Sequence, residues 1–98
     1  DLTPEEVTVL TTMTERYYPR LLRAIKNLNA LIVHVKLHHE TGGRRQYSFH
    51  IRCIGPTKPF ETDKHHGFEL SQTLHHAYDA LLAEIHHKFH NDVSGKPD

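Results

Sequence analysis

Residues 31–38 read Leu31-Ile32-Val33-His34-Val35-Lys36-Leu37-His38, and here the periodicity of the chain changes from helical to alternating. Successive side chains of a strand point to opposite faces of its sheet. One face therefore carries Leu31, Val33, Val35 and Leu37, and the other carries Ile32, His34, Lys36 and His38. The alternation predicts a strand that buries its first face against a core.

Two further strands are predicted after this one. Glu40-Thr41-Gly42-Gly43 favours a tight turn, because glycine tolerates positive φ. The next strand, over about 45–54, is expected to bury Tyr47, Phe49, Ile51 and Cys53 and to expose Gln46, Ser48, His50 and Arg52. Gly55-Pro56-Thr57-Lys58-Pro59 predicts another turn, Phe60 to about Lys64 a short third strand, and Lys64-His65-His66-Gly67 a loop.

A helix is predicted on each side of these strands. Thr3-Pro4-Glu5-Glu6 has the pattern of a capping box. The apolar stripe that follows it consists of Val7, Leu10, Met13, Tyr17, Leu21, Ile25 and Leu28. Pro19 is expected to kink this helix or divide it into about 4–17 and 19–27. A second helix should begin near Phe68 or Ser71 and end near Asn91, with a stripe of Leu70, Leu74, Ala77, Tyr78, Leu81, Ile85 and Phe89.

This order of elements predicts an α+β two-layer sandwich, with an antiparallel sheet of three strands and both helices on one of its faces. Residues 1–92 are expected to form one domain and 93–98 a disordered tail. No apolar run approaches the roughly 20 residues that span a bilayer, so no membrane partner is expected. The absence of a signal-type segment and the single Cys53, interpreted as a small core residue, favour a cytoplasmic location.

The composition is rich in histidine, with eleven histidines among 98 residues. Twelve Lys and Arg balance twelve Asp and Glu, so the formal net charge is zero while histidine is neutral. An ordinary imidazole gains a proton near pH 6.5. Mild acidification is therefore expected to make the surface basic and to strengthen any binding to nucleic acid.

Residues 31–90 resemble the bacterial and plastid ribosome hibernation factors, also called S30AE or sigma-54 modulation proteins. The most specific stretch is 67–85, which reads GFELSQTLHHAYDALLAEI. The resemblance implies a non-enzymatic, stress-related factor that binds the small ribosomal subunit and its rRNA and silences translation. It also implies a fourth strand before the first helix. The chain departs from the family pattern at Ser71, Ala80 and Ala83, and its last helix ends in His86-His87-Lys88-Phe89-His90 where Lys and Arg are usual.

An RNA-binding protein needs cations that replace counterions along the phosphates. The candidate RNA-binding residues are Lys36, Arg44, Arg45, Arg52, Lys58, Lys64, His86, His87, Lys88 and His90. We expect them, and the imidazoles in general, to gather on one solvent-facing side. A second set, Arg16, Arg20, Arg23 and Lys26, forms either an ordinary solvated helix face or a ridge that contacts phosphate.

Other functions are left open by the sequence. Double-stranded RNA-binding domains share this element order, but their signature motifs are absent. The pair His86 and His90, or the set His34, His38 and His50, has metal-ligand character without a close third ligand, so no metal or cofactor is expected. Cys53 faces away from His34 and His50, so no enzyme is expected, although a two-histidine ribonuclease arrangement stays open. A protein-interaction module, such as a homodimer, would use Ile32, Ile54 and the edge strand near Phe60.

Overall fold

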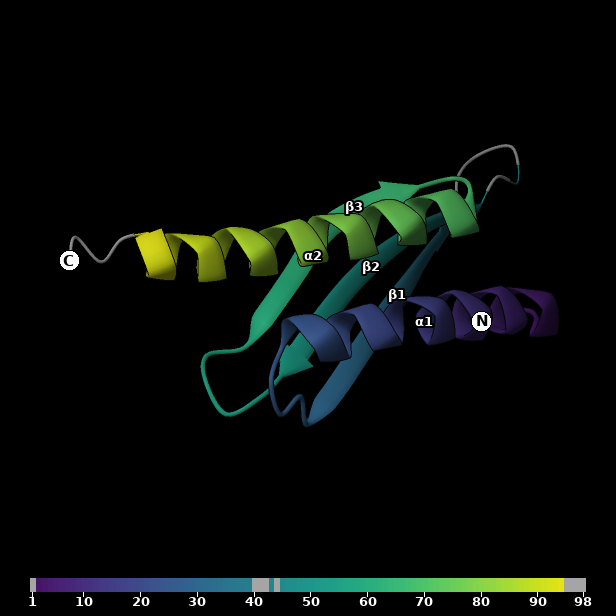
Figure 1. The fold of residues 1–98 in the computed structure, drawn as a ribbon. Coiled ribbons are helices and arrows are strands. Elements are labelled where there is room, and N and C mark those ends of the chain that lie inside the picture. Colours follow the sequence, from purple (N-terminus) through teal and green to yellow (C-terminus); the bar gives the residue numbers. More distant parts are fainter. Residues whose placement is uncertain (1, 40–42, 44, 95–98) are drawn as a thin grey trace.

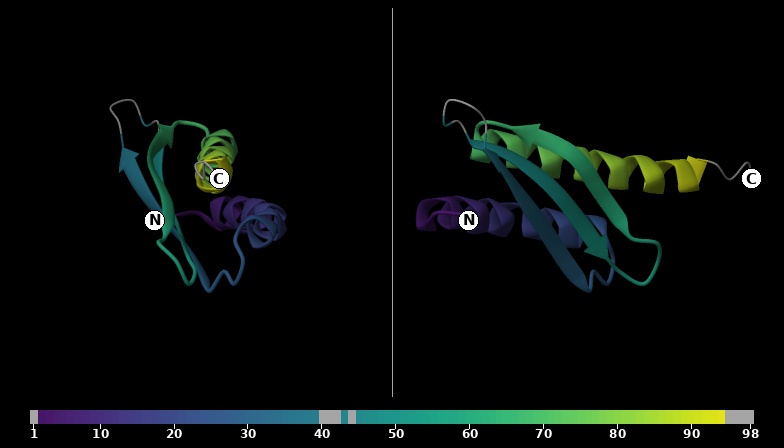
Figure 2. Two further views of the ribbon diagram at one scale, coloured as in Figure 1. Left: turned by 60° about the vertical axis from the view of Figure 1, so that its left-hand side comes forward. Right: turned by 180° about the vertical axis from the view of Figure 1, so that it is seen from behind.

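The computed structural model describes residues 2–39, 43 and 45–94, with the side chains of all of these except 39, 64 and 90–94. The elements are α1 (Pro4–Ala24), β1 (Ala30–His39), β2 (Arg45–Ile54), β3 (Phe60–Gly67) and α2 (Leu70–Ser94). The strands of the described part form one antiparallel sheet in the order β1-β2-β3. Both helices lie on one face of it and run in the same direction (Figures 1 and 2). The predicted α+β two-layer sandwich is confirmed.

The first helix begins at the predicted capping box. The backbone N–H of Glu6 donates to Thr3 Oγ1 at 3.1 Å, and the backbone N–H of Thr3 donates to Glu6 Oε1 at 2.8 Å. Pro4 occupies the first helical turn, where its missing N–H costs nothing. The helix ends at Ala24, and Asn27 then takes a φ of 60°, a left-handed conformation that asparagine tolerates and that turns the chain toward β1.

The predicted division of this helix at Pro19 is wrong, because α1 is continuous from Pro4 to Ala24. A proline inside a helix costs about 3 kcal/mol through the lost hydrogen bond and the ring clash. Tyr17 and Leu21 lie on either side of it and are both buried. Burial of two large side chains contributes about 3–6 kcal/mol. Packing therefore offsets the local penalty and keeps the helix whole.

The strand pairing confirms the predicted faces of the sheet. His34 lies opposite His50, and Val35 lies opposite Phe49. On the helix-facing side of β2 the side chains from Tyr47 to Cys53 are buried, whereas the corresponding side chains of β1 are only half-buried at the sheet edge. Five residues expected to be exposed are half-buried, namely Ile32, Gln46, Ser48, His50 and Ile54. Of the predicted turn between β1 and β2, Gly43 is the described residue, and its φ of 82° is one that favours glycine.

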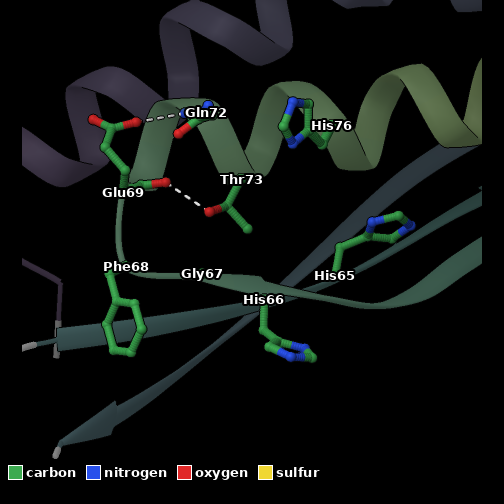
Figure 3. A pocket seen from close by; sticks show the side chains of 8 residues that line it. All are labelled: His65, His66, Gly67, Phe68, Glu69, Gln72, Thr73 and His76. Carbon is green, nitrogen blue, oxygen red and sulfur yellow. Dashed lines mark hydrogen bonds between the residues drawn. The ribbon is translucent and has the colours of Figure 1, made fainter.

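The third strand is longer than predicted and runs to Gly67, so the loop expected over 64–67 is wrong. Thr62 pairs with Ile51, and His65 pairs with Phe49. Two residues of β3 therefore stand opposite one residue of β2, which is a β-bulge. The bulge resets the alternation and lets the pairing continue, so His65 points toward the helices and His66 points away from them (Figure 3).

The core lies between the sheet and the helices. Every position of the predicted α2 stripe from Leu70 to Ile85 is buried, and the Tyr17 and Tyr78 rings stack across the two helices with centroids 4.7 Å apart. Val7 and Phe89, predicted as members of the two stripes, are exposed instead. The end of α2 extends past the sheet (Figure 1), and its helical part reaches Ser94, two residues into the predicted tail. Residues 95–98 lie outside the described part.

A carboxylate clasp ties α1 to the sheet. Glu6 accepts hydrogen bonds from Arg45 Nη2 at 2.8 Å, from Arg45 Nε at 3.0 Å and from the Tyr47 hydroxyl. Burial alone would raise the pKa of Glu6. The hydrogen bonds from Tyr47, Thr3 and Arg45, together with the Arg45 charge, lower it from 4.5 to about 2. The charged form of Glu6 is therefore the one that stabilises the fold.

Glu6→Gln is expected to lower the free energy of unfolding by about 1–2 kcal/mol at pH 7, because it removes charged hydrogen bonds at a partly exposed site. Since the pKa of Glu6 is lower in the folded state, the wild-type advantage is complete above pH 4.5 and disappears as the pH falls toward 2. Urea unfolding between pH 2 and pH 7 measures this. Equal stabilities of the two proteins at pH 7 would show that the clasp contributes nothing.

Gly67 lies where β3 turns toward α2, directly below Thr73 (Figure 3). A Cβ on Gly67 would stand 2.4 Å from Thr73 Oγ1, which is buried and donates to the Glu69 carbonyl at 2.7 Å. Gly67→Ala is therefore expected to cost about 1–3 kcal/mol. The other Thr73 atoms stay at 3.6 Å or more from that Cβ, so adding Thr73→Ala should remove the clash.

Thermal unfolding of Gly67→Ala, with Gly55→Ala as the matched control, measures this cost. A Cβ at Gly55 meets its nearest neighbours at 3.5 Å, an ordinary contact distance, so that variant should lose less stability. Equal losses at Gly55 and Gly67 would contradict the assignment of the cost to Thr73.

Candidate nucleic-acid interface

The basic residues predicted to bind RNA, as far as their side chains are described, do not form one surface. Lys36 and Arg52 lie on the sheet face away from the helices, because they alternate with the buried side chains of β1 and β2. Arg45 is held by Glu6 near the start of α1. Lys58 and Lys88 come together at a cleft beside the end of α2. The expectation of one continuous basic face is therefore wrong.

The remaining members of the predicted set divide further. His86 lines a groove between the two helices, and His87 is exposed on α2. Arg44 lies outside the described residues, as do the side chains of Lys64 and His90. Of the described side chains, Arg45 is half-buried and the others are exposed, namely Lys36, Arg52, Lys58, His86, His87 and Lys88. The sequence had no information on which side of the two-layer fold each one lies.

The described histidines also lie on both sides of the molecule. Those on the open sheet face are His34, His38, His50 and His66, and those on α2 are His75, His76, His86 and His87. The sheet is between the two groups. The predicted gathering of the imidazoles on one side is wrong, so an RNA surface has to be chosen from the local charges around each group.

The groove between α1 and α2 brings together three basic side chains, two of them arginines. It has a volume of about 180 Å³ and is lined by Arg20, Arg23, Ala24, Leu82 and His86. None of these lining residues is acidic. Two guanidinium groups and one imidazole from two helices thus surround a space that suits a phosphate group. Arg20 and Arg23 belong to the set that the sequence left undecided between a solvated face and a phosphate ridge.

A hydrogen-bonded cluster of Tyr17, His75 and Asp79 links the two helices next to this groove. The Tyr17 hydroxyl donates to Asp79 Oδ1 at 2.9 Å and lies 2.5 Å from His75 Nδ1. His75 Nε2 lies 3.1 Å from Asp79 Oδ2. Burial, and then the hydrogen bond and charge of Asp79, raise the pKa of Tyr17, so its hydroxyl stays protonated. The guanidinium of Arg20 lies 5.0 Å from the centre of the Tyr17 ring, a cation–π contact that positions Arg20 beside the groove.

The open sheet face has mixed charges. Its hollow is lined by His34, Lys36, Ser48, His50 and Asp63, among others. The His34 and His50 rings lie 6.0 Å apart, and His50 Nε2 lies 2.7 Å from a carboxylate oxygen of Glu61. The carboxylates of Glu61 and Asp63 on this face would repel the phosphates of RNA. It is a weaker candidate for RNA than the groove between the helices.

A third site lies between the end of β3 and the start of α2, with a volume of about 460 Å³. Figure 3 shows His65 and His76 on its opposite walls. The Glu69 side chain accepts a hydrogen bond from the backbone N–H of Gln72 at 2.7 Å. This N–H at the start of α2 is therefore already paired with a carboxylate of the chain. Nowhere among the described residues do three or more His, Cys, Asp or Glu side chains stand where they could hold a metal ion.

Cys53 lies in the core beneath the helices. Burial raises the pKa of its thiol to about 11. The thiol is therefore protonated at neutral pH and closed to solvent, which is the opposite of what a nucleophile requires. This agrees with the prediction of a small core residue.

Comparison with protein-family models, with curated proteins and with solved structures finds no match to this chain. In the described part, no helix is both long and apolar enough to cross a membrane. The assignment of the candidate interface therefore rests on the geometry of the cationic groove between the two parallel helices.

Proposed function

We propose that this protein is a non-enzymatic, ribosome-associated factor of the cytoplasm that binds the rRNA of the small subunit and reduces translation under stress. The observation that carries the RNA-binding part is the groove in which Arg20, Arg23 and His86 come together without an acidic neighbour among the lining residues. The resemblance of residues 31–90 to ribosome hibernation factors supplies the ribosome as the partner.

Zero net charge is compatible with this function, because a docked phosphate responds to the local field. Three carboxylates have partners elsewhere in the structure. Glu6 is paired with Arg45, and Glu61 lies close to His50 on the far side of the sheet. Asp79 is the acidic residue nearest to Arg20 in the cluster described above, and it accepts from Tyr17. Among the residues that line the groove, Arg20, Arg23 and His86 can carry positive charge and none carries negative charge.

Filter binding of purified small-subunit rRNA at pH 6 and pH 8, at fixed salt, tests the proposal. We expect binding at both pH values and about fivefold tighter binding at pH 6, because imidazole is the side chain class that ordinarily gains charge in this range and His86 lines the groove beside Arg20 and Arg23. Affinity should also fall steeply with salt, as counterion release requires.

His86→Gln is the matched control for the pH effect, since glutamine keeps a polar side chain without a titrating group. This variant should gain less affinity than the wild type between pH 8 and pH 6, because the other histidines remain. The absence of any binding by the wild type would overturn the proposed function, and a pH response unchanged in His86→Gln would overturn the role of His86.

A further inference from the structure

A cleft of about 250 Å³ lies between the β2–β3 loop and the end of α2. It is lined by Thr57, Lys58, Pro59, Phe60, Lys88 and Phe89. The two lysines were predicted to bind RNA from separate parts of the sequence, and the fold brings them to the same cleft. The groove between the helices does not include any of these residues.

The floor of this cleft has an exposed aromatic ring in a supported position. Phe89 is 40% exposed although it continues the buried stripe of α2. Its ring lies 5.5 Å from that of the buried Phe60, at an angle of 57°. This tilted arrangement is a favourable aromatic packing geometry. Phe60 therefore fixes the Phe89 ring while solvent still reaches it.

The charges around the ring favour an anionic ligand with an aromatic part. Lys58 and Lys88 are both exposed, and the cleft has no acidic lining residue. A nucleotide combines a π-face that stacks on aromatic side chains with a phosphate that pairs with ammonium groups. The volume lies below the roughly 300–1,000 Å³ of pockets for larger ligands, so it suits one nucleotide unit.

We propose that this cleft binds one unpaired nucleotide of RNA, with its base stacked on Phe89 and its phosphates between Lys58 and Lys88. The inference rests on the proposed function, because an RNA already held in the groove between the helices presents its neighbouring nucleotides at high local concentration. His86 of the groove and Lys88 of the cleft are about 3 Å apart along the axis of α2 but point to different sides of it, so an RNA that curves around α2 reaches both sites.

The experiment uses an RNA hairpin with a single-stranded extension that carries one 2-aminopurine, and the same hairpin without the extension. The wild type should bind the extended RNA more tightly and should quench the 2-aminopurine fluorescence on binding. Phe89→Leu keeps an apolar cover over Phe60 but removes the stacking ring. It should weaken binding of the extended RNA by about fivefold to a hundredfold and abolish the quenching.

Three further variants make the result specific. Phe89→Tyr retains an aromatic ring and should restore both affinity and quenching. Phe68→Leu changes a phenylalanine of similar exposure, 41%, at the other end of α2 and should behave as the wild type. Replacing Lys58 and Lys88 together by glutamine should make the salt dependence of binding shallower by about 1.4 in the slope of log K against log salt.

The outcomes separate the two proposals. If the wild type binds the hairpin stem but Phe89→Leu binds and quenches the extended RNA as the wild type does, the nucleotide site is overturned and the proposed function stands. If the wild type binds neither RNA, both proposals are overturned. Circular dichroism of each variant confirms that the fold is retained.

Discussion

Replacing both Arg20 and Arg23 by glutamate is expected to weaken binding of small-subunit rRNA by about 100-fold. These side chains supply the two permanent cations of the groove between the helices. Each reversal removes a charged hydrogen bond to phosphate and adds a carboxylate that repels it. Filter binding at constant pH and salt measures the loss.

The matched control reverses Lys36 and Arg52, which changes the net charge by the same amount on the opposite face of the molecule. This variant should lose less than about threefold, since distant exposed charges are screened over roughly 10 Å at moderate salt. If the sheet variant loses as much affinity as the groove variant, the binding surface has been assigned to the wrong side of the fold.

Leu81→Ala is expected to lower the free energy of unfolding by about 3 kcal/mol. Leu81 is completely buried in the layer between α2 and the sheet. Truncation of such a leucine removes its burial energy and leaves a cavity, at a typical total of about 2–5 kcal/mol. The melting temperature should fall by roughly 12–24 °C in a domain of this size. Urea unfolding and calorimetry measure both quantities.

Leu22→Ala is the control for this substitution. Leu22 also belongs to a helix, but it is 45% exposed on α1. Its replacement should cost less than about 1 kcal/mol, because little apolar surface returns to water. A similar loss for the two variants would contradict the position of the core.

Much of the fold could be predicted because its signals are local. Alternation from Leu31 to His38 reports the two faces of a strand, and His34 does lie on the predicted face away from the helices. The capping box of Thr3 and Glu6 involves side chains one helical turn apart. Each of these patterns is produced by geometry within a single element, which a sequence displays directly.

The wrong predictions concern effects that act between elements. Pro19 stays inside α1 because Tyr17 and Leu21 pack against other parts of the chain. Gly67 belongs to β3 because the bulge is set by pairing with β2. Phe89 is 40% exposed although it continues the stripe, because its cover depends on how much of the sheet lies beside that turn of α2. Local periodicity contains no information on these contacts.

The candidate site was the least predictable part for the same reason. Two parallel helices bring Arg20 of α1 next to His86 of α2, although 66 positions separate them in the chain. Lys58 and Lys88 line the same cleft because the β2–β3 loop lies beside the end of α2. The regular spacing of Arg16, Arg20 and Arg23 along one side of a helix was the available signal for a cationic ridge. Only the fold shows that α2 lies beside this ridge and forms the second wall of the groove.

The central claim is that the groove between α1 and α2 holds small-subunit rRNA. Sedimentation of cell extract through a sucrose gradient tests it most directly, with the wild type compared with the variant in which Arg20 and Arg23 are glutamate. The account predicts that the wild type migrates with small subunits while the variant stays in the light fractions. A wild type confined to the light fractions, or a variant that still migrates with small subunits, would contradict it.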